Sequence, residues 1–487
     1  MRVAHALAIL AACLATQAKR PNILFILTDD QDWHMESVEH MQSLKSDIVN
    51  KGASFDRHFC TVALCCPSRA TLCTGRAAHN HNVTKVSPPH GGYPKVVDRG
   101  INDDYLPIWM QEAGYNTYYS GKLWNFHNVN NYNSPYVKGY NSSDFLLDPY
   151  TYRYWDSKMT HNDEARVSYA GKYSTDAVAD KAYALLDEAL SHEEPWFLTV
   201  SPIAPHSNWV FDEKTNTSYL SMPQSAYRHE HLFNDYQIPR GKSFNSAIEG
   251  GASWWRQRLR ALQAVDEMVH ELVEKLADDG ELDNTYSFYT TDNGYTSAST
   301  ACNRVRNAAT VCDTDIHVPL FVRGPGVAAG AQFDSVTTHT DIAPTLLRIA
   351  NADKQLDGEN FEAGIHFGLY PNNTYKGLRL AGDGFSVYYS VWCTGERELF
   401  DLRADPEQTL NLLSEAGAHA ASRFAVSGRP ISDVVPRLDA LMMVLKDCKD
   451  RTCMRPWGGA APRGRRRIAA RGPGPPSTTR STRVSRR

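Results

Sequence analysis

Short apolar runs recur along the chain, and most of them end in a group of polar, reactive residues. The five runs are Asn22–Leu27, Tyr115–Tyr119, Trp196–Val200, Tyr286–Tyr289 and Ile316–Val322. Runs of this length, rich in aromatic and branched side chains, are typical of buried strands. We therefore predict strands that are spread over most of the chain.

Between the runs lie two segments whose apolar residues recur at helical spacing. They are Ser174–Leu190 and Trp254–Leu276, and Gly280 follows the second one as a stop signal. Strands that alternate with helices predict an α/β fold, with a large, mostly parallel sheet covered by helices on both faces. Ligands of such sheets bind beyond the carboxyl ends of the strands, which is where the reactive residues fall.

The pattern changes after about residue 350. Ser386–Trp392 and Arg397–Leu402 predict a short hairpin, and Leu438–Leu445 predicts a helix. We expect a catalytic domain over residues 19–350 and a small C-terminal α+β subdomain over residues 351–457. Residues 458–487 are rich in Arg, Gly, Pro and Ser without periodicity, which predicts a disordered tail.

Residues 1–18 have the pattern of a signal peptide. Arg2 is followed by a mostly small and apolar segment, His5–Leu14, and by small residues around Ala18. A membrane anchor is the alternative, but the run is shorter than the roughly 20 apolar residues of a membrane span. The chain also carries four glycosylation sequons, at Asn82, Asn141, Asn216 and Asn372. We expect a protein without a membrane span that is secreted, or held in a periplasm or cell wall.

Charge and cysteine content narrow the class of protein. Nine arginines lie after residue 462, and without them 42 basic residues remain against 55 acidic ones. This acidic body argues against general nucleic-acid binding. Ten cysteines are present, of which Cys448 and Cys453 are close enough for a local disulfide. Cys302 and Cys312 are a second, weaker candidate pair.

The strongest chemical motif is CCPSR, at residues 65–69. Pro67 suits the first turn of a helix and Gly75 suits its end. Cys65 is then expected at a helix N-terminus, where free N–H groups favour an anion. Arg69 lies about one turn further along, as a fixed cation beside Cys65. For a cysteine considered alone, a structural thiol or a disulfide is the simpler interpretation.

Two pairs of residues with side-chain oxygen atoms form a second candidate site. Asp29-Asp30 follows the first predicted strand, and Asp292-Asn293 follows the fourth. All four side chains offer hard oxygen ligands, which suit calcium or magnesium. Each pair alone is usually a turn. Because both pairs follow strands, they can meet at one edge of the sheet.

Two basic residues also follow predicted strands. Lys122 ends the sequence Ser120-Gly-Lys122, and His206 ends the sequence SPIAPH. A lone lysine or histidine in such a place is more often a solvated loop residue.

Two further features can be explained without a role in chemistry. His79 and His81 lie just past the cysteine motif, and they could line the cleft or serve no chemical role. The Trp254-Trp255 pair and its neighbouring arginines indicate helix packing and solvated charge.

With these motifs, the chain resembles the type I sulfatases over about residues 20–457. The resemblance rests on RPNILFILTDDQD, VALCCPSRATLCTGRAAHNHNVT, PHGGYPKV, YLPIWMQEAGYNTYYSGK, SPIAPH and DIHVPLFVRGPGV. The resemblance is closest to algal and fungal arylsulfatases, and next to N-acetylglucosamine-6-sulfatases. The implied fold is an alkaline-phosphatase-like α/β sandwich with a smaller C-terminal subdomain, which agrees with the pattern above.

The resemblance implies a role for each motif. Cys65 is implied to be converted by the formylglycine-generating enzyme into formylglycine, whose hydrated aldehyde attacks sulfur with one hydroxyl and expels sulfate with the other. Lys122 and His206 are implied to bind the sulfate group, and Asp292 is a candidate base. The implied ligands of one calcium ion per chain are Asp29, Asp30, Asp292 and Asn293.

Three departures from the family pattern stand out. Many sulfatases have a histidine two residues after the first lysine, where this chain has Trp124. The family's second substrate lysine has no counterpart between Tyr295 and Thr314; Arg304 or Arg306 could hold sulfate there, but an arginine cannot give up a proton. The Arg-rich tail resembles nothing in the family. The tail is either a genuine extension or a gene-model error, and the same error could explain the missing lysine.

Three functions remain open from the sequence. The first is a sulfuric ester hydrolase, most specifically an arylsulfatase or alternatively an N-acetylglucosamine-6-sulfatase. The second is a sulfatase-like binding protein with impaired catalysis. The third is a phosphodiesterase or phosphonate hydrolase of the same superfamily, with the same nucleophile and metal.

Overall fold

The computed structural model describes the chain from residue 19 to residue 456, with gaps. The described residues are 19–212, 215, 217–237, 251–295, 313–352, 354–357, 375–382, 384–392, 395–406, 408–454 and 456. The expected signal peptide at 1–18 and the expected tail at 458–487 therefore lie outside them.

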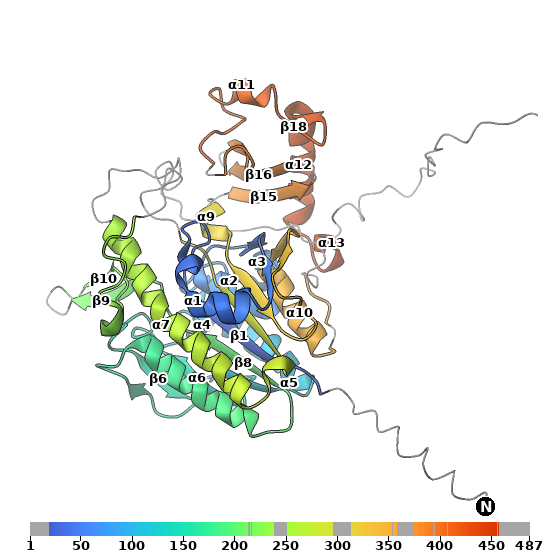
Figure 1. Ribbon diagram of the computed structural model, residues 1–487. Coiled ribbons are helices and arrows are strands. Elements are labelled where there is room, and N and C mark those ends of the chain that lie inside the picture. The colour runs from blue at the N-terminus through green and yellow to red at the C-terminus, as the bar shows by residue number, and fades with distance from the viewer. Residues whose placement is uncertain are drawn as a thin grey trace, which may run out of the picture.

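A ten-stranded sheet forms the centre of the protein (Figure 1). In order across the sheet, the strands are β13 (Ala331–Phe333), β2 (Ala53–Phe55), β12 (Leu320–Arg323), β11 (Thr285–Thr291), β1 (Asn22–Thr28), β8 (Trp196–Ser201), β4 (Asn116–Gly121), β5 (Ser142–Leu146), β6 (Lys158–His161) and β7 (Val167–Ser168). The five strands from β11 to β5 are parallel, whereas β12 and β6 run antiparallel to their neighbours. The predicted large, mostly parallel mixed sheet is confirmed.

Strand β1 divides its side chains between two hydrophobic cores, because successive residues of a strand point to opposite faces. Leu24 and Ile26 pack on the face covered by α6 (Ser174–Leu190) and α7 (Gly251–Asp278). The residues of β1 that alternate with these two pack on the other face, against α2 (Cys65–Thr74), α5 (Leu106–Glu112) and α10 (Ile342–Ile349). Helices therefore cover both faces of the sheet, as predicted.

The strand runs and helical segments of the catalytic part were predicted at or near their observed positions, with one exception. The apolar run Ile316–Val322 is only partly a strand: its first residue ends the short helix α9 (Asp313–Ile316), and β12 begins at Leu320. Pro319 separates the two parts, because proline has no N–H to donate to a strand ladder. Its carbonyl instead accepts a hydrogen bond from the Thr290 hydroxyl at 2.7 Å.

A smaller antiparallel sheet with one long helix forms the C-terminal part. Its strands are β15 (Tyr375–Gly382), β16 (Phe385–Trp392) and β17 (Arg397–Asp401), and α12 (Ile431–Leu445) packs against them. The predicted hairpin is β16–β17. The helix begins seven residues before its predicted start, and it continues through Pro436.

Short elements complete the described chain. They are α1 (Gln42–Leu44), β3 (His58–Phe59), α3 (Ala78–His81), α4 (Gly92–Asp98), β9 (Asn208–Asp212), β10 (Thr217–Ser221), β14 (Thr337–Thr338), α11 (Ala418–Ala421), β18 (Ala425–Val426), β19 (Arg429–Pro430) and α13 (Arg451–Met454). Cys448 and Cys453 form the predicted local disulfide, and the pair Cys302 and Cys312 lies outside the described residues. Within the described part of the chain, no helix is both long enough and apolar enough to cross a membrane.

Candidate active site at the carboxyl ends of the central strands

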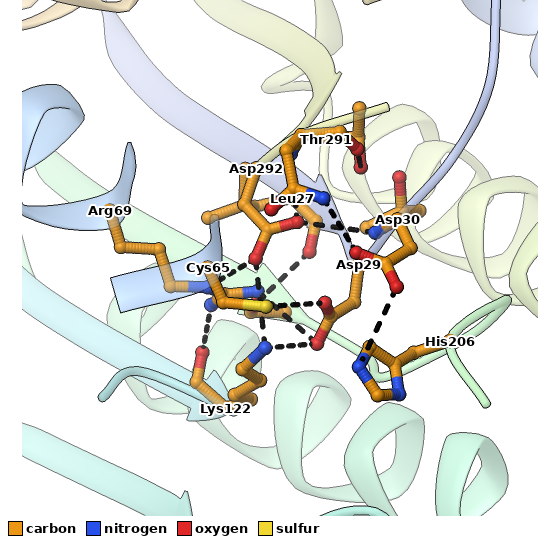
Figure 2. Close-up of polar contacts among 12 residues, drawn as sticks. Leu27, Asp29, Asp30, Cys65, Arg69, Lys122, His206, Thr291 and Asp292 are labelled. Atoms are coloured by element: carbon orange, nitrogen blue, oxygen red, sulfur yellow. Dashed lines mark hydrogen bonds and ion pairs between the residues drawn. The ribbon is translucent and has the colours of Figure 1, made fainter. Parts of the chain in front are cut away.

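Four neighbouring parallel strands end beside the N-terminus of one helix, and their ends carry most of the predicted site residues (Figure 2). Asp29 and Asp30 follow β1, and His206 follows β8. Lys122 follows β4, and Asp292 with Asn293 follows β11. The sheet thus joins segments that lie up to 263 residues apart in the chain.

Helix α2 places Cys65 at its first position. The residue before it, Leu64, has an extended backbone, and Gly75 closes the helix in a left-handed conformation with φ 57°. The Cys65 thiol lies 3.6 Å from Oδ1 of Asp29 and is buried, with 7% of the residue exposed. Burial raises the pKa of this thiol well above its usual range, and the nearby Lys122 charge only partly opposes that effect. An unmodified Cys65 is therefore a neutral thiol at neutral pH.

The acidic residues form a compact set of oxygen atoms. Asp292 Oδ1 accepts hydrogen bonds from the backbone N–H groups of Asp30 at 3.2 Å and Asn293 at 2.9 Å. The Asn293 amide donates to Asp30 Oδ1 at 2.6 Å. Within the described residues, the buried Oδ1 of Asn293 has no hydrogen-bond partner. A buried, unpaired carbonyl oxygen beside carboxylates fits a hard divalent cation.

Two buried cations face these carboxylates. Arg69 Nε donates to Asp292 Oδ2 at 2.8 Å, and its Nη2 lies 3.7 Å from Asp29 Oδ2. Lys122 forms an ion pair with Asp29, and its Nζ lies 3.6 Å from Asp292 Oδ2. Burial alone would raise the pKa of Asp292, but Arg69 and Lys122 outweigh it and hold that pKa below its usual range.

Asp29 and Lys122, which form an ion pair, both have shifted pKa values. The pKa of Asp29 is raised to about 6, first by burial and then by the neighbouring Asp292 charge, although Lys122 opposes the rise. For Lys122, burial lowers the pKa, but the neighbouring carboxylates, Asp29 above all, raise it above its usual range. Lys122 is therefore a fixed ammonium group in this site.

His206 has a defined tautomer and direction. Its Nδ1 lies 2.8 Å from the Ser207 carbonyl, which can only accept, so Nδ1 carries a hydrogen. Its Nε2 faces Asp30 Oδ2 at 3.5 Å. Ligand atoms of Asp29, Asp30, Cys65 and His206 all lie within 4.8 Å of one another. The ring edge of His206 thus points into the same small space as the cysteine and the acidic set.

Sequence reasoning missed one buried residue of this region, Arg258 on α7. The interpretation of the arginines near Trp255 as solvated charge is wrong for Arg258, which is fully buried. Its guanidinium donates to the Asp30 carbonyl and, at 3.1 Å, to the Pro205 carbonyl. Arg258 lies three residues after Trp255 and one before Leu259, both buried, so its place on the apolar stripe of α7 was the available signal.

Several other candidates lie apart from the cluster or outside the described residues. His81 contacts the Thr71 hydroxyl at 3.0 Å, and His79 contacts the Cys448 carbonyl at 2.8 Å. Both side chains are therefore engaged away from the acidic set. Trp124 is buried in the core between the sheet and α5. Arg304 and Arg306 lie outside the described residues.

The sequon residues divide in the same way. Asn82 and Asn141 are exposed, as an acceptor of a glycan must be. Asn216 and Asn372 lie outside the described residues.

The sheet has the alkaline-phosphatase-like fold, and it places a buried cysteine at a helix N-terminus opposite carboxylates and cations at the strand ends. The chain belongs to the sulfatase family, whose model matches residues 21–352. The chain is 33% identical to an arylsulfatase of Volvox carteri, over 95% of this chain and 80% of the relative. It is therefore a sulfatase, an enzyme that hydrolyses sulfuric esters.

Further similarities agree with this family. An N-acetylglucosamine-6-sulfatase of Capra hircus is 27% identical, over 91% of this chain and 86% of that protein. The solved structure of BT4656 in complex with its substrate D-glucosamine-2-N,6-O-disulfate matches with a TM-score of 0.61 at 21% identity, over 83% of this chain and 95% of that one. This structural match confirms the predicted fold.

Proposed function

We propose that the protein is an arylsulfatase that acts through formylglycine at Cys65 and one calcium ion. The main observation behind this proposal is the position of Cys65, at the start of α2 and 3.6 Å from Oδ1 of Asp29. Lys122 and Arg69 bring positive charge to the same space, and the Nε2 edge of His206 faces it. An ester sulfate carries one negative charge, which this arrangement is suited to receive.

The state of the thiol supports a modified nucleophile. A thiol must ionise to attack, and burial raises the pKa of Cys65 well above neutrality. A hydrated aldehyde at this position needs no thiolate, and it has two hydroxyl groups: one to attack sulfur and one to release the sulfate afterwards. Asp29, which is in contact with the Cys65 side chain, is positioned to take up the proton of the attacking hydroxyl, in place of the expected base Asp292, whose Oδ2 is engaged by Arg69. The maturation partner is then a formylglycine-generating enzyme.

The metal proposal rests on the donor set. Asp29, Asp30, Asp292 and Asn293 offer oxygen atoms, which calcium and magnesium prefer over softer metals. The Oδ1 of Asn293, unpaired among the described residues, points to a ligand that these residues do not supply. When bound, a divalent cation would neutralise charge on a sulfate oxygen. Lys122 and Arg69 remain to fix the carboxylates from the opposite side.

The missing second lysine favours an aryl ester. No lysine lies between Tyr295 and Thr314 to protonate a leaving group. A phenol leaves without much help because it is a far stronger acid than a sugar hydroxyl. Aryl sulfates should therefore be hydrolysed faster than sugar sulfates.

Export to an oxidising compartment is proposed on separate grounds. The Cys448–Cys453 disulfide requires such a compartment to persist, and two exposed sequons agree with it. Secretion, a periplasm or a cell wall all satisfy this condition.

The test combines mass spectrometry with turnover. Protein made in its own host is digested, and the peptide with Cys65 is expected to be lighter by the exchange of CH₂SH for an aldehyde. The same protein should release sulfate from para-nitrophenyl sulfate, faster than from N-acetylglucosamine 6-sulfate and faster than it cleaves a phosphate diester or phosphonate ester. The Cys65→Ala variant should lose turnover. The matched control is Cys73→Ala, which removes another buried cysteine of α2 and should retain turnover.

Each other outcome has a definite meaning. An unmodified Cys65 peptide with no turnover would support the impaired, sulfatase-like binding protein. A preference for the sugar sulfate would overturn the leaving-group argument. Faster cleavage of phosphate or phosphonate esters would assign the site to the third function.

A further inference from the structure

Tyr152, in the connection between β5 and β6, lies against two of the proposed sulfate-binding residues. Its ring stacks on the His206 ring, with centroids 4.2 Å apart and an angle of 29° between the planes. The Lys122 ammonium lies over the ring of Tyr152, 4.8 Å from its centroid. One aromatic ring therefore contacts side chains that follow two different strands, β8 and β4.

The ring is itself held at two points. Its hydroxyl accepts a hydrogen bond from the Asn125 amide at 2.7 Å. Its backbone carbonyl accepts from the Trp209 N–H at 2.9 Å, which ties this connection to β9, just after His206. The nearby Tyr154 hydroxyl also donates to the His206 carbonyl, at 2.7 Å. The position of the ring is thus fixed independently of the two side chains that it contacts.

We propose that the Tyr152 ring is a positioning residue that holds Lys122 and His206 in the orientation needed to bind the sulfate group, an inference that rests on the proposed function.

For Lys122, the geometry leaves little freedom. The ammonium contacts the carboxylates of Asp29 and Asp292, and it also lies over the ring of Tyr152. A cation is attracted to the face of an aromatic ring, so the ring restrains the ammonium in addition to the carboxylates. An aliphatic side chain in the same place would give neither the attraction nor a flat wall.

For His206, the ring removes the remaining degree of freedom. Nδ1 is bonded to the Ser207 carbonyl, which fixes one edge of the imidazole. The stacked face of Tyr152 fixes its plane. Nε2 is then the edge presented to the acidic set and to a bound anion.

The same connection provides a matched control. Tyr150 also carries two cations on its ring, with Lys158 Nζ at 3.8 Å and the Arg153 guanidinium at 4.5 Å. Neither of these cations belongs to the candidate site. Tyr150→Leu therefore makes the same chemical change, two residues earlier, without touching Lys122 or His206.

The experiment compares Tyr152→Leu, Tyr152→Met, Tyr152→Phe and Tyr150→Leu in the full chain. For Tyr152→Leu and Tyr152→Met, we expect kcat/KM for para-nitrophenyl sulfate to fall roughly tenfold, and the inhibition constant of inorganic sulfate to rise roughly tenfold. Tyr152→Phe, which keeps the ring, and Tyr150→Leu should stay within about twofold of the wild type in both quantities. A variant that only loses stability would lower the apparent kcat but leave KM and the inhibition constant unchanged.

Two results would overturn the proposal. One is a sulfate inhibition constant in Tyr152→Leu, or in Tyr152→Met if the leucine variant does not fold, that matches Tyr150→Leu. The other is an equal loss in Tyr152→Phe, which would assign the effect to the hydroxyl. If the wild type hydrolyses no sulfate ester, the proposed function fails. The positioning role is then decided by calorimetric titration of inorganic sulfate into the same variants.

Discussion

Arg258→Met should cost far more stability than its position among three arginines of α7 indicates. Arg258 is fully buried, and its guanidinium donates to the carbonyls of Asp30 and Pro205. Its Nη2 also lies 3.8 Å from Oδ1 of Asp32, a buried carboxylate. The substitution keeps the length of the side chain but removes every donor and the positive charge.

The magnitude follows from what would be left behind. Two carbonyls that now accept from a charged donor would be buried without it, at about 1–3 kcal/mol each. Asp32 would lose its buried countercharge, and breaking such a pair typically costs about 3–5 kcal/mol in all. Since water can enter part of the space, we expect a loss of about 4 kcal/mol in the free energy of unfolding.

Urea unfolding followed by tryptophan fluorescence measures this loss. The control is Arg260→Met, two residues further along the same helix. Arg260 also donates to a backbone carbonyl, that of Leu232 at 2.7 Å, but it is partly exposed, so its replacement should cost under about 1 kcal/mol. If the free energies of unfolding of the two variants differ by less than about 1 kcal/mol, the stabilising role assigned here to the buried Arg258 guanidinium is refuted.

Three other predictions concern metal, pH and the disulfide. Calcium at about a hundredfold excess over its Kd should raise the free energy of unfolding by roughly 2.7 kcal/mol, and Asn293→Ala should weaken this effect. A melting temperature that changes neither with calcium nor with EGTA would contradict the proposed metal site. Burial lowers the pKa of His127 to about 4, so neutral His127 stabilises the fold fully above its unfolded pKa of about 6.5 and this contribution is lost as the pH falls towards 4. Between pH 7 and pH 5, the wild type should therefore lose about 2 kcal/mol more than His127→Phe, in which the new ring lies between those of Tyr93 and Phe145; equal losses would contradict it. Replacing both Cys448 and Cys453 by serine should cost about 2 kcal/mol, from the short loop that the disulfide closes, and a reducing agent should then have no further effect on the melting temperature.

Much of the central sheet could be predicted because its strands are buried on both faces. Such strands are continuous apolar runs, as in Asn22–Thr28, and every residue of β1 is in fact buried. The direction of β12 could not be read from the same signal. An apolar run looks the same in a parallel and an antiparallel pair, and only the sheet order places β12 between β11 and β2.

The candidate site was predictable where its residues follow strands. Asp29, Lys122 and Asp292 each lie within three residues of the end of an apolar run, so their place at one edge follows from the parallel sheet. Arg258 and Tyr152 carry no such signal. The first reaches the site from the middle of a long helix, and the second from an irregular connection, so both depend on tertiary contacts that local patterns do not encode.

The position of β1 sets the time at which this site can exist during synthesis. Its two neighbours pair with it at Phe197 and Thr285, so β1 has no complete set of partners until most of the catalytic part has been made. At about 5–20 residues per second, roughly 10–40 s separate the synthesis of Cys65 from that of β11. During that interval the segment around Cys65 cannot yet pack against the end of β11, whereas in the finished protein the same thiol is buried. The proposed conversion of Cys65 is therefore expected to take place before β1 has paired with both of its neighbouring strands.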